Sequence, residues 1–251
     1  MLAPVIACLA GLAVGSFLNL VITRLPRGES LALPRSKCPA CGRPILWRDN
    51  IPLVSFLLLQ GRCRSCGAAI SWRYPLVELL SAGVAVALWF RFPASPLLLV
   101  YGPFAAALIV ITFLDLEHLW IPDLITYPGI LLGLVYSLIF PHLTFAGALS
   151  GAVLGGASFY AVAWGYLRLT GREGLGGGDV KLMAMIGAFL GLRSLPWVVL
   201  ISALLGSIAG GLWIIAKRSK AAQTPIPYGP FLGVAALVYL LWQEKFLLWG
   251  P

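Results

Sequence analysis

The sequence predicts an all-α membrane protein that crosses the bilayer about eight times and carries one small zinc-binding loop domain. Of its 251 residues, 60% are hydrophobic and only 11% are charged, whereas soluble domains carry about 25% charged residues. The apolar residues gather in runs, several of which approach the roughly 20 residues that a helix needs to cross the hydrocarbon core. Composition and run length together argue against a soluble globular domain.

The apolar runs give eight candidate spans: 2–23, 75–90, 97–114, 121–140, 145–169, 182–192, 197–216 and 231–249. The first run lacks the basic start of a signal peptide, so we expect it to remain as a span. The sixth run is too short to be assigned alone, and we expect a tilted, half-buried or partly re-entrant helix. Glycines within the fifth and seventh runs are expected to serve close helix packing.

Lysine and arginine are distributed unevenly between the two sides of such a bundle. Fifteen fall on one side, and the other side receives only Arg91, Arg193 and Lys245. Cytoplasmic loops carry the excess of these residues, which places the first side in the cytoplasm and both termini outside. The cations stand in short blocks between apolar runs, a pattern that does not indicate nucleic-acid binding.

Two Cys-x-x-Cys pairs lie in the polar segment between the first two runs. They are Cys38 with Cys41 and Cys63 with Cys66, and 21 residues separate the pairs. Two such turns can complete a tetrahedral four-thiolate zinc site. Disulfides are the alternative, but a cytoplasmic loop is reducing. We therefore expect a structural zinc that holds the loop together and takes no direct part in catalysis. Cys8, inside the first run, is expected to serve packing.

The expected organisation follows from this loop: a first span at 1–23, a cytoplasmic zinc-binding loop domain at 24–73, and a polytopic region at 74–251. Within the loop, the apolar run 51–59 has nine residues and cannot cross the bilayer. We expect it to lie on the membrane surface or to pack against the spans.

Two carboxylates at the edges of apolar runs are candidates for chemistry. Asp115 ends the third run, and Asp179 follows the glycine-rich stretch 174–178. By the topology above both lie at the cytoplasmic face, where two facing carboxylates cannot both ionise easily. One could then activate a water while its protonated partner polarises a scissile carbonyl. Two alternatives remain open, namely that Asp179 caps a helix N-terminus and that the carboxylates form an ion or proton pathway.

These residues resemble a known family. Asp115, the Ile-Pro-Asp stretch that ends at Asp123, and Gly176 to Asp179 with Lys181 are similar to the Gly-x-Gly-Asp signature of the type IV prepilin leader peptidases. Further stretches of the chain agree with that family: Gly-Ser-Phe-Leu-Asn at 15–19, Arg-Leu-Pro at 24–26, both cysteine pairs, Arg-Tyr-Pro at 73–75 with Glu78, and Ile-Pro-Tyr-Gly-Pro-Phe at 226–231. The resemblance therefore runs along the whole chain.

The resemblance implies an inner-membrane aspartic endopeptidase that removes short basic leaders from prepilins or pseudopilins at the cytoplasmic face. Asp115 and Asp179 match the catalytic pair. Asp123 is an alternative candidate for the catalytic pair. It matches a family position where Asn also serves, however, and we expect it to cap a helix. The supporting positions that match family motifs are Gly176, Gly178, Lys181 and Glu78. Lys181 could pair with a carboxylate or extend to lipid head groups.

Members of this family with the cysteine loop commonly also methylate the new N-terminal amine with S-adenosylmethionine. The resemblance therefore implies a second, methyltransferase activity, although the sequence identifies no cofactor-binding residues. Two hypotheses from other classes compete with the peptidase. One is an ion-coupled membrane transporter that uses intramembrane carboxylates. The other is a membrane scaffold protein that is stabilised by zinc and has no catalytic activity.

Overall fold

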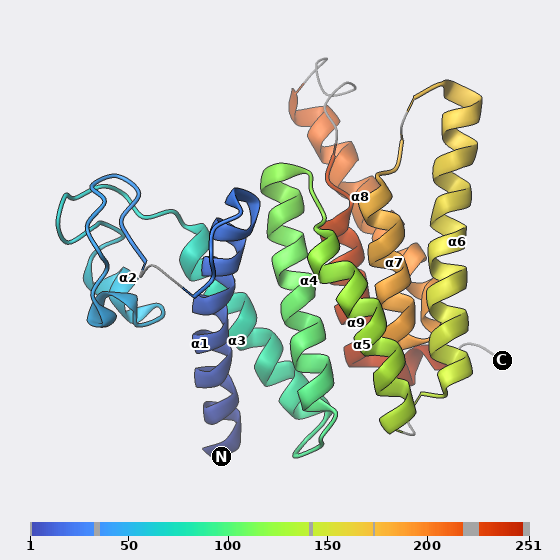
Figure 1. Ribbon diagram of the computed structural model, residues 1–251, viewed down its shortest axis with the longest axis horizontal. Helices are drawn as coiled ribbons and strands as arrows, with labels where there is room; N and C mark the ends of the chain where they lie inside the picture. The colour runs from blue at the N-terminus through green and yellow to red at the C-terminus, as the bar shows by residue number, and fades with distance from the viewer. Residues whose placement is uncertain (1, 33–35, 141–142, 173, 218–225, 248–251) are drawn as a thin grey trace. The chain divides into compact units, whose positions relative to one another are not determined.

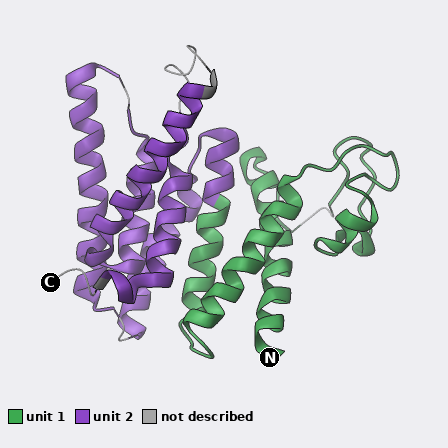
Figure 2. Cartoon of the chain, turned by 180° about the vertical axis from the view of Figure 1, so that it is seen from behind, with its two compact units in different colours: residues 1–110 green, residues 111–251 purple. Residues whose placement is uncertain are grey.

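The computed structural model describes residues 2–32, 36–140, 143–172, 174–217 and 226–247, and in this part the chain is predominantly helical (Figure 1). Strand pairing in the same residues is limited to two isolated bridges, Lys37 with Pro44 and Arg62 with Ala69. The chain divides into two compact units, Met1–Val110 and Ile111–Pro251 (Figure 2). The predicted all-α class is confirmed.

The first unit is built on two long helices joined by the cysteine-containing loop. Its elements are α1 (Leu2–Arg24), η1 (Leu25–Arg27), η2 (Trp47–Asn50), α2 (Val54–Leu58), α3 (Arg73–Arg91) and the first part of α4 (Leu98–His118). Helix α1 presents Gly11 and Gly15 to α3, and a Cβ atom at Gly11 would lie 2.6 Å from the Cα of Ala82. Small residues at this spacing let two membrane helices approach closely, so the contact depends on these glycines.

The second unit places one short helix at the centre of several longer ones. Its elements are the end of α4, α5 (Asp123–Ile139), α6 (Phe145–Thr170), α7 (Gly177–Leu190), η3 (Leu192–Ser194), α8 (Leu195–Lys217) and α9 (Gly229–Leu247). Helix α7 contacts α5, α6 and α9, and most of its side chains are buried. Gly187 on α7 and Gly151 on α6 approach so closely that neither position has room for a Cβ atom.

The burial of α7 explains the short sixth apolar run. We expected a tilted, half-buried or partly re-entrant helix over 182–192, but the helix begins earlier, at Gly177, and ends at Leu190. Its residues Leu182, Met183, Met185 and Ile186 have no exposed surface. A helix that is apolar on every side is typical of a buried core element. The run is therefore apolar because protein surrounds it.

Five helical segments in the described part of the chain are long and apolar enough to cross a membrane: Leu2–Arg27, Arg73–Arg91, Leu98–His118, Phe145–Thr170 and Leu192–Ile215. Helix α5 is apolar but shorter. The expected spans 182–192 and 231–249 correspond to α7 and α9, and neither is among the five. The last two residues of the final run, and 218–220 of the cationic block at 217–220, lie outside the described residues.

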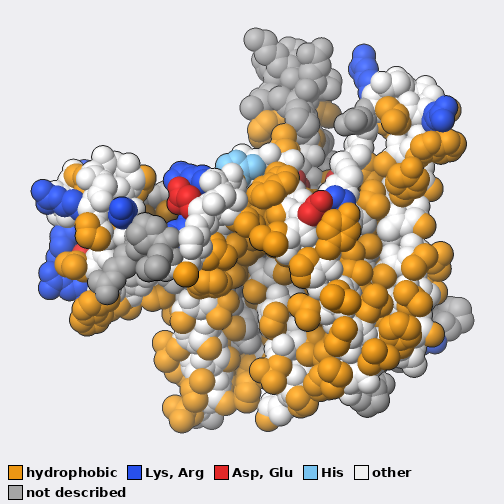
Figure 3. All heavy atoms as spheres, in the orientation of Figure 1, with side chains coloured by type: hydrophobic (Ala, Val, Ile, Leu, Met, Phe, Trp, Pro, Cys, Tyr) orange, Lys and Arg blue, Asp and Glu red, His pale blue; other side chains and the backbone are white. Residues whose placement is uncertain are grey.

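The face of the helices that Figure 3 shows is largely apolar. Large side chains such as Leu131, Leu138, Val162 and Ile208 are each more than half exposed. Soluble monomers rarely expose apolar surface of this extent, whereas lipid covers it without cost. The surface therefore supports insertion of these helices into a membrane.

Candidate active site and metal site

Asp115 lies near the C-terminal end of α4 and is almost completely buried, with 6% of its surface exposed. Its Oδ2 atom accepts a hydrogen bond from the backbone N–H of Gly229, the first residue of α9, at 2.8 Å. A Cβ atom at position 229 would lie 2.8 Å from the same oxygen. Glycine at 229 therefore allows the backbone of α9 to approach the carboxylate directly.

The turn before α9 is held by a second buried contact. The hydroxyl of Tyr228 lies 2.8 Å from the hydroxyl of Ser202 on α8, and Ser202 has no exposed surface. The Tyr228 ring also packs against the rings of Phe159 and Phe231. These contacts fix the backbone that carries the Gly229 N–H.

The sequence prediction did not assign any role to Gly229, Tyr228 or Ser202. The stretch 226–231 was recognised only as part of the family resemblance. A glycine next to Pro230, after a tyrosine that follows Pro227, is a local signal for a fixed turn. Nothing local indicates that this turn contacts a carboxylate more than 100 positions earlier in the chain.

Asp179 lies in the first turn of α7, before the apolar part of that helix, and 8% of its surface is exposed. Its Oδ2 atom accepts a hydrogen bond from the backbone N–H of Gly176, the N-cap residue, at 3.3 Å. The other oxygen, Oδ1, is buried and has no hydrogen-bond partner among the described residues. Capping therefore occupies one oxygen of Asp179 and leaves the other available.

The two carboxylates interact electrostatically. Burial raises the pKa of Asp179 to about 7, and the negative charge of Asp115 contributes to the same shift. Like charges disfavour double ionisation, so the negative charge of Asp115 favours the protonated form of Asp179. Both carboxylates that the sequence singled out are thus buried in the second unit, and the charge of Asp115 acts on Asp179.

A cavity of about 360 Å³ adjoins Asp179. Its walls come from the segment that joins α4 to α5 and from the start of α7: Leu119, Trp120, Ile121, Asp123, Gly176, Gly177, Gly178, Asp179 and Lys181. Ligand pockets begin at about 300 Å³, so this space could take a short peptide segment. A Cβ atom at Gly178 would lie 2.8 Å from the Cβ of Ile121. Glycine at 178 therefore lets the start of α7 pack against Ile121, and it adds no side chain to the cavity wall.

Asp123 and Lys181 form an ion pair at the edge of this cavity. The Nζ atom of Lys181 lies 2.6 Å from Oδ1 of Asp123, and this hydrogen bond raises the pKa of Lys181. We expected Asp123 to cap a helix, but the N-cap of α5 is Pro122 and no side-chain cap is formed there. The carboxylate of Asp123 instead pairs with Lys181. Of the two roles expected for Lys181, pairing with a carboxylate or extending to lipid head groups, the structure shows the first.

Glu78 lies in the first unit and does not belong to the carboxylate pair. Its Oε2 atom accepts a hydrogen bond from the backbone N–H of Leu53 at 2.9 Å, and Glu78 is buried on α3. Leu53 is the residue before α2. Glu78 therefore fastens the cysteine-containing loop to a long helix.

The four loop cysteines form one cluster. The Sγ atoms of Cys38, Cys41, Cys63 and Cys66 all lie within 4.8 Å of one another, and those of Cys38 and Cys66 are 3.9 Å apart. A tetrahedral zinc with Zn–S bonds of about 2.3 Å requires sulfur atoms about 3.8 Å apart. All four cysteines are free thiols in the structure, so the cluster fits a metal ion better than the disulfide alternative.

The two halves of the cluster share one backbone pattern. In each, the N–H of the first cysteine bonds to a carbonyl five residues later, at 2.9 Å for Cys38 and 2.8 Å for Cys63. The residue after each second cysteine is a glycine with positive φ, +70° at Gly42 and +69° at Gly67. Glycine adopts this conformation without steric cost. Two equivalent turns thus present their thiols to a common centre.

A helical membrane protein with a buried carboxylate that lines a glycine-walled cavity and is influenced by the charge of a second buried carboxylate fits the class of membrane aspartic peptidases. Residues 9–92 match the family model of the bacterial peptidase A24 N-terminal domain, and residues 103–211 match that of the type IV leader peptidase family. The chain belongs to the type IV leader peptidase family. No solved structure matches it.

Several curated relatives are similar to the chain over almost its whole length. A prepilin leader peptidase/N-methyltransferase of Aeromonas salmonicida is 39% identical over 96% of this chain and 91% of the relative. The protein of the same description in Pseudomonas aeruginosa is 39% identical over 94% and 89%. A type 4 prepilin-like proteins leader peptide-processing enzyme of Escherichia coli is 40% identical over 97% and 95%. The predicted family is therefore confirmed.

Proposed function

We propose that this chain is a membrane aspartic endopeptidase that removes short basic leader peptides from prepilins or pseudopilins. The observation that supports this function most strongly is the buried Asp179 carboxylate, which lines a glycine-walled cavity and whose pKa is raised in part by the charge of the buried Asp115. The descriptions of the relatives name the same substrate class. The glycines leave room for an extended substrate backbone to approach Asp179.

The two carboxylates take different roles in this proposal. The Gly229 N–H at 2.8 Å favours the charged form of Asp115 more strongly than the Gly176 N–H at 3.3 Å favours that of Asp179. Asp115 then accepts a proton from the attacking water. Asp179 holds the shared proton on its unpartnered Oδ1 and donates it toward the scissile carbonyl oxygen. A free buried oxygen suits this role because substrate binding would supply its missing partner.

Leader cleavage is expected to fall above about pH 7. Because burial and the charge of Asp115 raise the pKa of Asp179 to about 7, its proton is present below that pH and is lost above it. The value of kcat/KM should decline about tenfold per pH unit on this limb. Asp123→Asn, which removes a carboxylate outside the pair, should leave the limb in place. A rate that stays constant up to about pH 9 would contradict the assignment of the proton to Asp179.

The proposal includes a second activity and two cofactors. We propose that the chain methylates the newly exposed N-terminal amine with S-adenosylmethionine as methyl donor, in keeping with the description of its relatives. We assign no residue to the methyl donor. The four-cysteine cluster would hold a structural zinc. With four thiolate ligands such an ion stabilises the loop fold and keeps no open position for substrate.

We also propose a location and an orientation. The chain would lie in the bacterial inner membrane and cross it eight times. The spans would be the five long apolar segments and, in addition, α5, α7 and α9. The excess of Lys and Arg on one side supports a cytoplasmic carboxylate pair and a cytoplasmic zinc loop. The division into a first span at 1–23, a loop domain at 24–73 and a peptidase region at 74–251 is part of this proposal.

Transport is less well supported than peptidase activity. An ion-coupled transporter usually binds its ions near the membrane midplane. Asp115 lies three residues before the end of α4, and Asp179 lies in the first turn of α7. Both carboxylates therefore sit at helix ends. No contact in the described part of the chain favours the transporter over the peptidase.

Mass spectrometry of a co-expressed prepilin tests both activities in one measurement. The wild-type chain should yield a pilin that has lost its leader and whose new N-terminus carries one added methyl group. A pilin that is cut but unmethylated would support the peptidase and overturn the methyltransferase. A prepilin that stays full-length, in the presence of folded enzyme, would overturn the proposed function.

A further inference from the structure

The loop of the first unit exposes large apolar side chains on its short helical segments. Trp47 on η2 is 82% exposed, Leu57 and Leu58 on α2 are 73% and 77% exposed, and Trp72, just before α3, is 77% exposed. We call η2, α2 and Trp72 together the apolar platform. Tryptophan and leucine beside arginine are typical of segments that lie in the membrane interface.

The platform is fixed at the depth of the first turns of a long apolar helix. The N–H of Leu53, directly before α2, bonds to Glu78 on α3, and the ring of Phe56 lies 5.0 Å from that of Trp72. Glu78 is the sixth residue of α3, or about 8 Å along the helix axis from its start. Because α3 is long and apolar enough to cross a membrane, this attachment holds α2 beside the first turns of a candidate span.

The anchor residue of α2 adopts a strained backbone conformation. Leu53 has φ +58° and ψ −46°, a region that a leucine rarely enters. The hydrogen bond to Glu78 compensates for this conformation. The unfavourable conformation of Leu53 thus occurs where its backbone N–H bonds to Glu78, which attaches α2 to α3 at a defined point.

The charge of the loop complements an anionic surface. Segment 24–73 contains nine Lys and Arg residues but only two acidic ones, Glu29 and Asp49. Arg43, Arg48 and Arg62 are exposed, and Figure 3 shows blue side chains and orange side chains close together on this part of the molecule. Each cation near an anionic leaflet adds to the attraction between the loop and the lipid surface. The exposed apolar side chains and the excess of positive charge therefore both favour contact with an anionic lipid surface.

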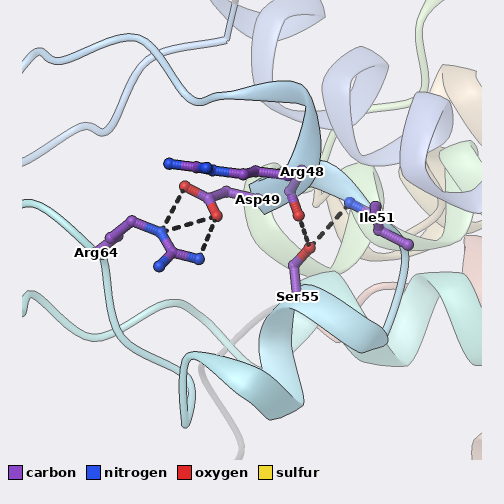
Figure 4. Close-up of polar contacts among 5 residues, drawn as sticks. All are labelled: Arg48, Asp49, Ile51, Ser55 and Arg64. Carbon is purple, nitrogen blue, oxygen red and sulfur yellow. Dashed lines mark hydrogen bonds and ion pairs between the residues drawn. The ribbon is translucent and has the colours of Figure 1, made fainter.

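The platform is braced internally and is joined to the cysteine cluster (Figure 4). The Ser55 hydroxyl donates to the carbonyl of Arg48 and accepts from the N–H of Ile51, both at 2.9 Å. Arg64, between Cys63 and Cys66, donates to both oxygens of Asp49 on η2, at 2.7 to 3.1 Å. This ion pair lowers the pKa of Asp49. The turn that carries two of the four thiols thus holds η2 directly.

We propose that the apolar platform docks on the anionic phospholipid surface of the bilayer that the chain spans, and that the four-cysteine cluster holds it in position through Arg64 and Asp49. Trp47, Leu57, Leu58 and Trp72 enter the head-group region, and Arg43, Arg48 and Arg62 contact lipid phosphates. The role of the cysteine cluster is then to orient a membrane-binding surface.

Hydrogen–deuterium exchange of the full chain in lipid nanodiscs tests this proposal. The amides of α2 should exchange at least about tenfold more slowly in phosphatidylcholine with phosphatidylglycerol than in phosphatidylcholine alone. Leu57→Ser combined with Leu58→Ser should remove this protection, since both side chains are exposed and their loss does not disturb the loop core. Arg27→Gln, which changes a cation paired with Glu29 outside the platform, is the matched control and should keep the protection.

Each further outcome decides between partners. Equal protection in both lipids would overturn the anionic surface as the partner. Protection that appears only when prepilin is added would identify a protein-docking surface and overturn the proposal. Asp49→Asn should raise the exchange of η2 and α2 in anionic nanodiscs while leaving the metal content unchanged. Unchanged exchange in this variant would overturn the link between the cysteine cluster and the platform.

Discussion

Replacing either Asp115 or Asp179 by asparagine lowers the rate of leader cleavage by about 1,000-fold or more. Asparagine keeps the size of the side chain and an acceptor oxygen, so the contacts to Gly229 and Gly176 can persist. It cannot accept the proton of the attacking water, nor donate an acidic proton to the scissile carbonyl. Cleavage of a purified prepilin in detergent, followed by mass spectrometry, measures the loss.

The matched control for these substitutions is Asp123→Asn. Asp123 lines the same cavity as Asp179 but pairs with Lys181 and is more than half exposed. Most of the cleavage rate should remain in this variant. Substantial cleavage by Asp115→Asn or by Asp179→Asn would refute the catalytic pair, and loss of activity in all three variants would point to a general disturbance of the site.

Substituting Cys38 and Cys41 together by serine is expected to abolish metal binding. Purified wild-type chain should contain about one zinc ion, because the four thiolates share a single centre, and the double variant should contain none. Structural zinc sites contribute about 10–16 kcal/mol in small zinc-dependent folds, so the loop should also become sensitive to proteolysis. Elemental analysis and limited proteolysis of segment 24–73 measure the two effects.

Cys8→Ser is the control for the metal site. Cys8 lies on α1, outside the four-cysteine cluster, and its substitution should leave the zinc content unchanged. We expect loss of zinc to impair methylation more than cleavage, since the carboxylate pair lies in the other unit. Absence of metal from the wild-type chain, combined with resistance of all four thiols to alkylation, would revive the disulfide alternative.

The features that the sequence predicted well are those encoded by neighbouring residues. Long apolar runs predicted α1, α4, α6 and α8, because a helix satisfies its own backbone groups in lipid. The four cysteines could be assigned to one centre because each Cys-x-x-Cys turn is a local unit. Asp115 and Asp179 were selected as candidates because an acidic residue at the edge of an apolar run has a high desolvation cost. Both are buried in the structure, and their catalytic role stays a prediction.

The features that the sequence did not reveal depend on contacts between distant segments. Two contacts join α4, α8 and the start of α9: the hydrogen bond from the Gly229 N–H to Asp115 and the buried contact between the Ser202 and Tyr228 hydroxyls. No periodic pattern in the sequence encodes such pairings. Helix α7 was interpreted as a doubtful span because hydropathy does not distinguish lipid from surrounding protein. The role of Glu78 could not be predicted either, since its partner is a backbone N–H in an irregular loop.

A double-mutant cycle tests most directly whether Asp115 and Asp179 act as one catalytic pair. The measurement is kcat/KM for leader cleavage by the wild-type chain, Asp115→Asn, Asp179→Asn and the variant with both substitutions. Residues that act as a unit show strongly non-additive losses, so the double variant should be no slower than the slower single variant. Losses that multiply in the double variant would show that the two carboxylates act independently and would contradict the paired mechanism.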